Sequence, residues 1–475
     1  MAKEHTGLSP LGTVEGDTIV AISTSMAQAG IGIVRLSGPQ AFSLADQIFH
    51  TPSGRPYSDQ DQRKMRYGHI MDGAQVLDEV LCVYMKAPHT YTVEDVVEID
   101  CHGGSVSVRK VLALLLKKGA RLADPGEFTK RAFLNGRLDL AQAEAVEDII
   151  TAKTNLAQQN ALGQLRGGLS LPLQAIKDQL LSLLAQVEYS INFMEDAQEE
   201  LPRTPLIDQA DQVIEQITGL LEGAETGRLL REGIRTVIVG RPNVGKSSLL
   251  NALLREERAI VTDIPGTTRD AIEESYQVKG LPLRLVDTAG IRKTADPVES
   301  LGVGRSMALL KEADLVLLLI DGTQPLLSED LDLLAQTKDQ VRILLLNKAD
   351  QGLQEKTMEA VRLADSSSPG SPMLALSAKT GQGLSDLEKT IHTLFFGAEE
   401  HHQSESLLSN LRQIDLLEKA QQALEEARKA LRAGVSLDAL DVDLQFAYQK
   451  LAEITGEAIE EDVLNKIFQN FCVGK

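Results

Sequence analysis

The strongest constraint on the fold of this chain is one eight-residue segment, Gly240-Arg-Pro-Asn-Val-Gly245-Lys246-Ser247. It follows the apolar run RTVIV and precedes the helical pattern SLLNALL, so it joins a buried strand to a helix. Glycines in such a loop let backbone N–H groups turn inward around a phosphate, and the helix N-terminus adds positive potential. The spacing therefore predicts a phosphate-binding loop in which Lys246 neutralises the β- and γ-phosphates and Ser247 ligates Mg²⁺.

Taken alone, this loop also fits a chance match or an ATPase, and three further motifs decide between these alternatives. Asp287-Thr-Ala-Gly290 ends the apolar run LRLV, where a carboxylate can hold Mg²⁺ through water and the Gly290 N–H can contact the γ-phosphate. Asn347-Lys348-Ala-Asp350 ends RILLL, and the Asp350 carboxylate can accept hydrogen bonds from guanine N1 and N2, a donor pair that adenine lacks. Ser377-Ala378-Lys379 is predicted to support the base. Together the four motifs predict a GTP site.

Hydrophobic patterning divides the 475 residues into four segments. Residues 1–138 carry short β-rich runs between Gly and Pro turns, which predict an α+β domain. Residues 139–231 and 398–475 have apolar residues at helical spacing. Residues 232–397 alternate continuous apolar strands with helices and predict a parallel sheet covered on both faces. We therefore expect an α/β P-loop domain inserted into one all-α domain that follows an N-terminal α+β domain.

Composition narrows the class of protein. Lys and Arg number 48 and Asp and Glu number 68, so the net charge of −20 argues against holding nucleic acid by bulk charge, and any contact with RNA must be local. No apolar run approaches the roughly 18 residues that span a bilayer, and the first 20 residues hold no apolar signal core. Three cysteines cannot make a disulfide framework, which favours a reducing cytoplasm. The adjacent Cys101 and His102 lack a second ligand pair at zinc spacing, which favours core or turn packing.

These motifs resemble the TrmE-Era-EngA group of GTPases, and the details narrow the resemblance to the tRNA modification GTPase family MnmE, also called TrmE. The segments that carry it run along the whole chain: PGEFTKRAFLNGRLDLAQAEAVEDII (125–150), GRPNVGKSSLLN (240–251), IVTDIPGTTRD (260–270), DTAGIR (287–292) and the terminal FCVGK (471–475). The Cys-x-Gly-Lys ending is the most discriminating, because related GTPases lack it.

The resemblance implies a full set of nucleotide contacts. Ser247 and Thr268 would hold Mg²⁺, and K⁺, bound by Asn243, Thr262, Ile264 and Thr267, would take the place of an arginine finger. Ile291 follows the DxxG glycine and cannot orient water, and the resemblance points instead to Glu299. On local sequence alone Glu299 fits a solvated carboxylate at a helix start equally well. The implied GTP-binding residues are Asn243, Val244, Gly245, Lys246, Ser247, Ser248, Thr262, Asp263, Ile264, Pro265, Gly266, Thr267, Thr268, Asp287, Thr288, Ala289, Gly290, Asn347, Lys348, Ala349, Asp350, Ser377, Ala378 and Lys379.

By the same resemblance, the N-terminal domain is similar to a tetrahydrofolate-binding fold that supplies a one-carbon unit from a 5-formyl or methylene form. The matching positions are Arg35, Glu98, Arg137 and Lys475. Cations there can pair with the folate glutamate tail, and a carboxylate can accept from the pterin. Arg137 stands where the family often has Lys, so charge is kept while geometry changes. Cys472 would be catalytic, with nearby Lys475 favouring thiolate, although a terminal Cys is as commonly a small buried hydrophobe.

The implied function is GTP hydrolysis coupled to wobble-uridine modification of certain tRNAs. An FAD-dependent partner similar to MnmG/GidA would join a homodimer formed through the N-terminal domain, adding an aminomethyl or carboxymethylaminomethyl group at C5. The alternative is an Era/EngA-like GTPase switch in ribosome assembly, which needs neither the folate-like domain nor the FCVGK tail and would carry an RNA-binding module such as a KH domain. A third hypothesis, a membrane-associated scaffold, is not supported, because the sequence shows no amphipathic basic helix.

Overall fold

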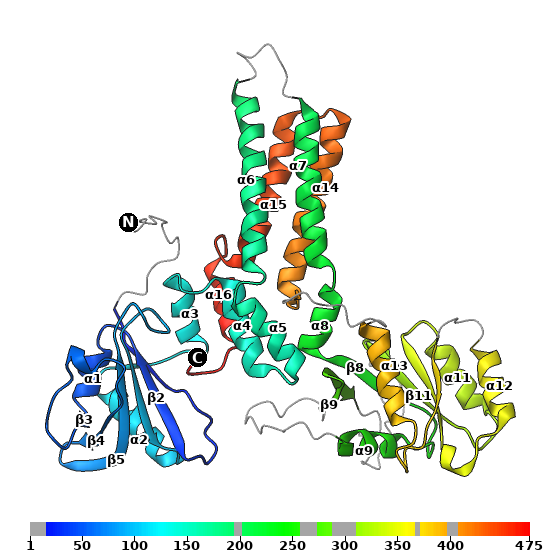
Figure 1. Ribbon diagram of the computed structural model, residues 1–475, viewed down its shortest axis with the longest axis horizontal. Coiled ribbons are helices and arrows are strands. Elements are labelled where there is room, and N and C mark those ends of the chain that lie inside the picture. Colours follow the sequence, from blue (N-terminus) through cyan, green and yellow to red (C-terminus); the bar gives the residue numbers. More distant parts are fainter. Residues whose placement is uncertain (1–15, 194–201, 257–272, 287–309, 366–370, 397–406) are drawn as a thin grey trace, which may run out of the picture. The chain divides into compact units, whose positions relative to one another are not determined.

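The computed structural model describes residues 16–193, 202–256, 273–286, 310–365, 371–396 and 407–475 (Figure 1). These residues form two compact units, each drawn from separate stretches of the chain. The first unit combines Met1–Glu147 with Gln164–Val213 and Lys419–Lys475, and the second combines Asp148–Gly163 with Ile214–Glu418.

The first unit contains a seven-stranded sheet with the strand order β3-β4-β5-β6-β2-β1-β7. Neighbouring strands are antiparallel except β1 and β7, which are parallel. The register between β2 and β6 places Arg35 directly opposite Glu98. The strands span Ile19–Ile22 (β1), Ile31–Ser37 (β2), Phe49–His50 (β3), Arg66–Asp72 (β4), Gln75–Met85 (β5), Val96–His102 (β6) and Arg121–Leu122 (β7).

Helices cover this sheet on both faces, because its strands alternate their apolar side chains. Val20 packs in one core with Leu44 of α1 (Ala41–Asp46) and Val111 of α2 (Ser105–Lys117). Its neighbour Ile19 points the other way and packs with Phe128 of α3 (Glu127–Leu134). The start of α3 therefore lies over β1, on the face opposite to α1 and α2.

Long helices complete the first unit. Lys177 of α6 (Ser170–Phe193) is buried and reaches Thr455 of α15 (Leu437–Thr455) at 3.4 Å, and the two helices pack along their lengths. Asp211 of α7 (Arg203–Leu221) pairs with Arg428 of α14 (Leu411–Ala433) at 2.8 Å. Helices from both sides of residues 232–397 therefore contact one another. Apolar residues join α16 (Glu461–Phe468) to α4 (Leu140–Thr151).

The second unit contains a six-stranded sheet with the order β13-β12-β11-β8-β10-β9. All neighbouring strands are parallel except β9, which pairs antiparallel with β10 through a turn at Lys279 and Gly280, both with positive φ. The strands span Ile234–Val239 (β8), Glu273–Val278 (β9), Leu281–Val286 (β10), Leu315–Asp321 (β11), Arg342–Asn347 (β12) and Met373–Ala375 (β13).

Two apolar cores sandwich this second sheet. Every residue of β11 is buried, with Leu317 in one core and Leu318 in the other. One core includes residues of α8 (Ala224–Glu232), α9 (Lys246–Glu256) and α13 (Leu384–Phe396), and the other includes residues of α11 (Ser328–Gln336) and α12 (Glu355–Ala364). Helix α5 (Asn155–Leu165) touches the β9–β10 turn, where a Cβ on Gly280 would overlap Leu156.

The sequence predictions of strand and helix agree with these elements in most places. The predicted runs in the N-terminal domain coincide with β1, β2, β5 and β6, and the predicted helical runs lie in α4, α6, α14 and α15. The expectation of a parallel sheet holds for β8, β10, β11, β12 and β13 and fails only at the edge strand β9. Strand β9 is antiparallel, because a two-residue turn returns the chain directly alongside β10.

Candidate functional site

The phosphate loop connects the carboxyl end of β8 to the N-terminus of α9, as the sequence predicts. Its backbone takes left-handed φ values at Gly240, Asn243 and Gly245. A Cβ on Gly245 would overlap the side-chain nitrogen of Asn347, so only glycine fits this close approach. The Lys246 ammonium lies inside the curve of the loop, donating to the carbonyls of Gly240 at 2.5 Å and Arg241 at 2.8 Å.

Asn347 ties three nucleotide loops together. Its side chain is buried, Nδ2 donates to the Val244 carbonyl at 2.7 Å, and Oδ1 accepts from the Ala378 amide at 2.9 Å. The residue therefore joins the phosphate loop, the end of β12 and the loop that follows β13. Asn347 therefore holds the loops together through side-chain hydrogen bonds, a role that the motif alone does not specify.

The two residues after Asn347 that carry charge are each held by a partner. Lys348 has φ +69° and its Nζ contacts Asp321 at the end of β11 at 2.6 Å. Burial by itself would raise the pKa of Asp321, but hydrogen bonds from Lys348 and Thr323 hold that pKa below its usual value. The exposed Asp350 accepts a 2.7 Å hydrogen bond from the buried Ser377 hydroxyl. Asp350 is thus aimed by the loop that carries Ser377.

The other predicted nucleotide residues divide into two groups. Asn243, Ser247, Ser248 and Lys379 are described and exposed, the first three on the phosphate loop and the start of α9, and the described Ala349, just after Lys348, is half-buried. Outside the described residues lie Thr262, Asp263, Ile264, Pro265, Gly266, Thr267, Thr268, Asp287, Thr288, Ala289, Gly290 and Glu299.

A second polar cluster lies in the first unit, around two of the predicted folate positions. Arg35 Nε donates to Glu98 Oε1 at 2.7 Å across the β2–β6 register, and both side chains are half-buried. The Arg35 guanidinium also lies 5.7 Å from the centre of the Phe128 ring. The pair therefore presents a cation and a carboxylate side by side next to an aromatic ring of α3.

The C-terminal segment docks against this cluster. Arg35 Nη1 donates to the Gly474 carbonyl at 3.1 Å, and the Ser23 hydroxyl donates to the same oxygen at 3.0 Å. The Gly126 amide, just before α3, donates to the Cys472 carbonyl at 3.2 Å. Gly474 has φ +90°, and a Cβ there would press on the backbone of Ile22. Three of the predicted folate residues, Arg35, Glu98 and Lys475, thus come from chain regions that meet here.

Cys472 lies just after α16, and the residue is exposed, which contradicts the alternative of a small buried hydrophobe. Partial burial of its thiol and the nearby Glu147 carboxylate raise the pKa of Cys472, whereas Lys475 acts in the opposite direction. Lys475 therefore favours the thiolate, as expected, but desolvation and a carboxylate outweigh its one ammonium, so the pKa of Cys472 is raised.

Arg137, the fourth predicted folate position, reaches the cluster through Tyr91. Its Nη1 donates to the Tyr91 carbonyl at 2.8 Å, and its guanidinium lies 4.7 Å from the centre of the Tyr91 ring. The Tyr91 hydroxyl is 2.9 Å from the Thr129 hydroxyl on α3. Burial raises the pKa of Tyr91, and the positive charges of Arg137 and Arg35 oppose that rise. Tyr91 therefore lies within electrostatic reach of both arginines.

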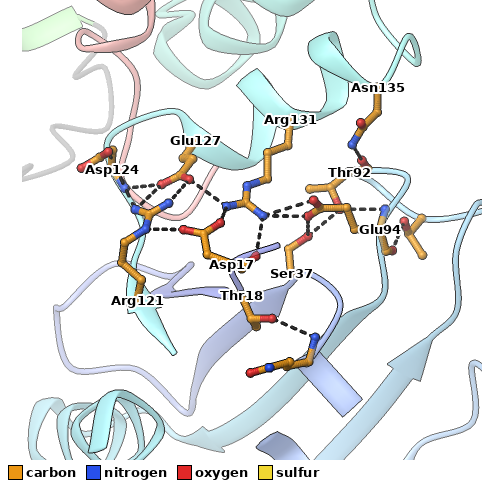
Figure 2. A network of polar contacts seen from close by, with 12 residues as sticks. Asp17, Thr18, Ser37, Thr92, Glu94, Arg121, Asp124, Glu127, Arg131 and Asn135 are labelled. Carbon is orange, nitrogen blue, oxygen red and sulfur yellow. Dashed lines mark hydrogen bonds and ion pairs between the residues drawn. The ribbon is translucent and has the colours of Figure 1, made fainter. Parts of the chain in front are cut away.

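Figure 2 shows a charged network that holds α3 in place beside this cluster. The Arg131 side chain is only 6% exposed and contacts Asp17 at 2.6 Å, Glu127 at 3.0 Å and Glu94 at 3.1 Å. Arg121 bonds Asp17 at 2.5 Å and also pairs with Glu127. Burial would raise the pKa of Asp17 and Glu127, but the two arginines hold both pKa values below the usual range.

Sequence reasoning missed several residues that build these sites. Asp321 carried a weak signal, since it ends an apolar strand in the same way as Asp287. Tyr91, Ser23 and the residues of the network in Figure 2 carried none, because they act through contacts between distant parts of the chain. Ser37 is one of them, and its hydroxyl donates to Glu94 at 2.7 Å.

Two kinds of feature are not found among the residues that the structure describes. Within the described ranges, His, Cys, Asp and Glu side chains form no cluster of three suited to a metal ion. Cys101 is buried, and His102 lies at the surface 2.7 Å from Asp78, as core and turn packing predicts. In the same part of the chain, every helix is too short or too polar to cross a bilayer.

Comparison with known proteins places both units in one family. The family model described as the MnmE helical domain matches residues 140–472, and the one described as the GTP-binding protein TrmE N-terminus matches residues 18–137. The tRNA modification GTPase MnmE of Geobacillus kaustophilus is 50% identical over 465 residues, covering 97% of this chain and 100% of that protein. The Alkaliphilus metalliredigens protein of the same name is 47% identical over 461 residues, covering 97% and 99%. The chain therefore belongs to the MnmE family of tRNA modification GTPases.

Proposed function

We propose that this protein hydrolyses GTP in the second unit and supports a one-carbon transfer to tRNA in the first. GTP hydrolysis in tRNA modification follows from the family. The finer proposal is that a partner similar to MnmG/GidA, with FAD, joins a homodimer of this chain in the cytoplasm. Together they add an aminomethyl or carboxymethylaminomethyl group to C5 of the wobble uridine of certain tRNAs. In this proposal residues 232–397 form a nucleotide domain inserted into the helical domain. The helical domain follows the N-terminal domain of residues 1–138 in the sequence.

The nucleotide chemistry is assigned to the loops around Asn347. Lys246 exchanges its contacts with loop carbonyls for the β- and γ-phosphates, and the α9 N-terminus adds positive potential. Asp350, aimed by Ser377, accepts from guanine N1 and N2. Because Asn347 bonds both Val244 and Ala378, the phosphate and base contacts are held at a fixed spacing.

Two cations belong to this proposal. Mg²⁺ would be held by Ser247 and Thr268, and K⁺ by Asn243, Thr262, Ile264 and Thr267. Of these residues, the structure describes Ser247 and Asn243, and both are exposed on the phosphate loop or the start of α9. Hydroxyl and amide oxygens are hard ligands that suit both ions. K⁺ would stabilise negative charge that develops on the phosphates, and Glu299 would orient the attacking water.

The one-carbon chemistry is carried by a single observation, the docking of Gly474 on Arg35. That contact brings the terminal Cys472–Lys475 segment to the Arg35–Glu98 pair. A carboxylate, two cations and the rings of Phe128 and Tyr91 fit a tetrahydrofolate, with its polar pterin edge and its anionic glutamate tail. Bound there, the folate supplies a carbon unit at the formaldehyde or formate level. Arg35 and Glu98 bind and orient it, and Cys472 lies within the same docked segment.

The decisive experiment measures wobble uridines by mass spectrometry in tRNA from cells that lack this protein. Loss of the C5 modification, restored by the wild-type gene, is the expected result. An unchanged uridine profile, with a defect in ribosomal subunits, would instead support the ribosome-assembly alternative.

Calorimetry tests the folate assignment separately. A 5-formyl tetrahydrofolate is expected to bind, and Arg35→Ala or removal of Lys475 is expected to weaken it. Each change removes a charge-assisted hydrogen bond worth about 1.5 to 3 kcal/mol, or about ten- to a hundredfold in affinity. Absence of binding to the intact protein would remove the folate assignment and leave the GTP site untouched.

A further inference from the structure

Tyr91 and Arg137 line an open cleft of about 750 Å³, and Val83 on its lining lies opposite Glu98 in the β5–β6 register. Apolar side chains line part of it, among them Val83, Met85 and Pro88. Two more groups that can carry positive charge, Arg63 and His89, lie on the lining with Arg137. Among the described residues that line the cleft, none is acidic. A cationic cleft stands out on a chain whose net charge is −20.

The cationic groups of the cleft are held in position by the backbone. Arg63 takes φ +59° and its amide donates to the Tyr84 carbonyl at 2.8 Å. Its guanidinium donates to the His89 carbonyl, which keeps the charged head over the cleft, and this bond uses one of five donors. Val93, also on the lining, has φ +67°, a costly conformation for a β-branched residue. Such outliers persist where the surroundings enforce them, often at ligand sites.

The cleft continues directly from the proposed folate site. Arg137 belongs to both, since it contacts the Tyr91 carbonyl and ring and also lines the cleft. A folate seated on Arg35 and Glu98 would direct its glutamate toward Arg137. Any further carboxylates attached to that glutamate would then run into the cleft toward Arg63 and His89.

We propose, on the basis of the function proposed above, that this cleft binds the γ-linked glutamate chain of a polyglutamylated tetrahydrofolate. Each added glutamyl unit brings one carboxylate for the guanidinium groups and one short methylene stem for the apolar lining. The net charge of the chain would repel a polyanion elsewhere, so the local cations decide where it binds. Arg63 and His89 are therefore specificity-determining residues that favour long-chain folates over the monoglutamate.

Calorimetry on the full-length protein tests this with two ligands, the monoglutamate and the triglutamate of 5-formyltetrahydrofolate. The triglutamate is expected to bind about tenfold more tightly at low salt, equivalent to about 1.4 kcal/mol. Arg63→Gln and His89→Gln are each expected to lower this ratio, and the double variant to bring it to about one. Because these side chains are exposed, 0.5 M KCl is also expected to shrink the ratio.

Two control variants separate the possible failures. Arg109→Gln removes an exposed charge on α2 outside the cleft and is expected to keep the ratio. Arg35→Ala is expected to weaken both folates together and also keep the ratio. Equal binding of the two folates to the wild-type protein, or a ratio that survives the double variant, overturns the glutamate-chain site while the folate site stands. Failure of both folates to bind overturns the proposed folate site itself, and this inference with it.

Discussion

The nucleotide loops are built in the opposite way to the proposed folate cluster, by which we mean the Arg35–Glu98 pair and the Gly474 segment docked on it. In the nucleotide loops, each motif is a contiguous segment at the carboxyl end of a strand, and Asn347 joins motifs already visible in the sequence. In the folate cluster, single residues far apart in the chain meet, as Arg35 does with Glu98 and with Gly474. A site made from loop backbone can be found by pattern, whereas a site made from scattered side chains is found only through the fold.

This contrast predicts that the two sites fail independently. Cys472→Ser is expected to lower tRNA modification by about 100-fold or more while GTP hydrolysis stays within about twofold, because Cys472 interacts with Gly126, Glu147 and Lys475 of the first unit. Both activities are to be measured on the same preparation, with Val473→Ala as a control in the same exposed segment. Hydrolysis falling as steeply as modification would mean that the sites are not separable.

The second prediction sharpens the nucleotide side of the comparison. Asp350→Asn is expected to weaken GTP binding by about 100-fold, since it removes the charged acceptor for guanine N1 and N2. The affinity for inosine triphosphate, which lacks the 2-amino group, is expected to fall much less on the same substitution. Titration of both nucleotides with the wild type and the variant checks this, with Ser377→Ala as the milder change, which removes the hydrogen bond to Asp350 and the one accepted from the Thr380 amide. An unchanged preference for GTP over inosine triphosphate would contradict the assigned role.

The third prediction concerns the cation on the phosphate loop. Turnover of GTP in KCl is expected to exceed turnover in NaCl at equal ionic strength by at least about tenfold, equivalent to about 1.4 kcal/mol of barrier. A ring of oxygens sized for K⁺ leaves ligands out of reach of the smaller ion. Asn243→Ala is expected to erase the difference, and aluminium fluoride with GDP should associate nucleotide domains in KCl only. Equal rates in the two salts would exclude potassium from the mechanism.

The fourth prediction uses the charged network of Figure 2. Asp17 and Glu127 have lowered pKa values, so their stabilisation is present above the ordinary carboxyl pKa of about 4 and is lost as the pH falls through the lower folded values. Thermal melts between pH 3 and 7 are expected to show this acid loss. The acid loss should become shallower in the double variant Asp17→Asn with Glu127→Gln, while the control Glu188→Gln, at an exposed position of α6 outside the network, keeps it. A steep loss retained in the double variant would assign it to other carboxyls.

The smallest expected effect is on the Cys472 thiol. Its raised pKa predicts slow alkylation by iodoacetamide near pH 8, with the rate rising at higher pH than for an ordinary thiol. Glu147→Gln removes a charge that raises this pKa, so it is expected to speed alkylation at pH 8, and Lys475→Met is expected to slow it. Mass spectrometry of the labelled peptide follows the rates. Changes in the reverse order would contradict the electrostatic assignment.

The sequence was sufficient for most of the fold and for the nucleotide loops. Continuous apolar runs predicted the buried strands β8, β10, β11, β12 and β13, and glycine spacing predicted the phosphate loop at the end of β8. Strand β9 escaped because its inward residues, Tyr276 and Val278, alternate with polar ones and make no apolar run. An edge strand that is buried on one side has apolar residues only at alternate positions, so it lacks the continuous apolar run of a central strand.

The folate cluster shows why the rest could not be predicted from residues alone. The pairing of Arg35 with Glu98 depends on the β2–β6 register, and the raised pKa of Cys472 depends on Glu147 of α4. The nearby Lys475 lowers this pKa, as its charge predicts, but burial and Glu147 raise it by more. Desolvation and contacts with residues distant in sequence arise only in the folded chain, so the local sequence cannot give the direction of the pKa shift.

The contact between Arg35 and Gly474 joins residues 439 positions apart. Closing a loop of that length in a flexible chain costs about 5 kcal/mol of conformational entropy, yet halving the length would save only about 0.6 kcal/mol. A whole nucleotide unit can therefore lie between the two halves of the cluster with little loss of equilibrium stability. The large separation lowers the folding rate instead, because so distant a contact forms late in folding. Refolding experiments should accordingly show nucleotide binding recovering before the C-terminal segment is docked.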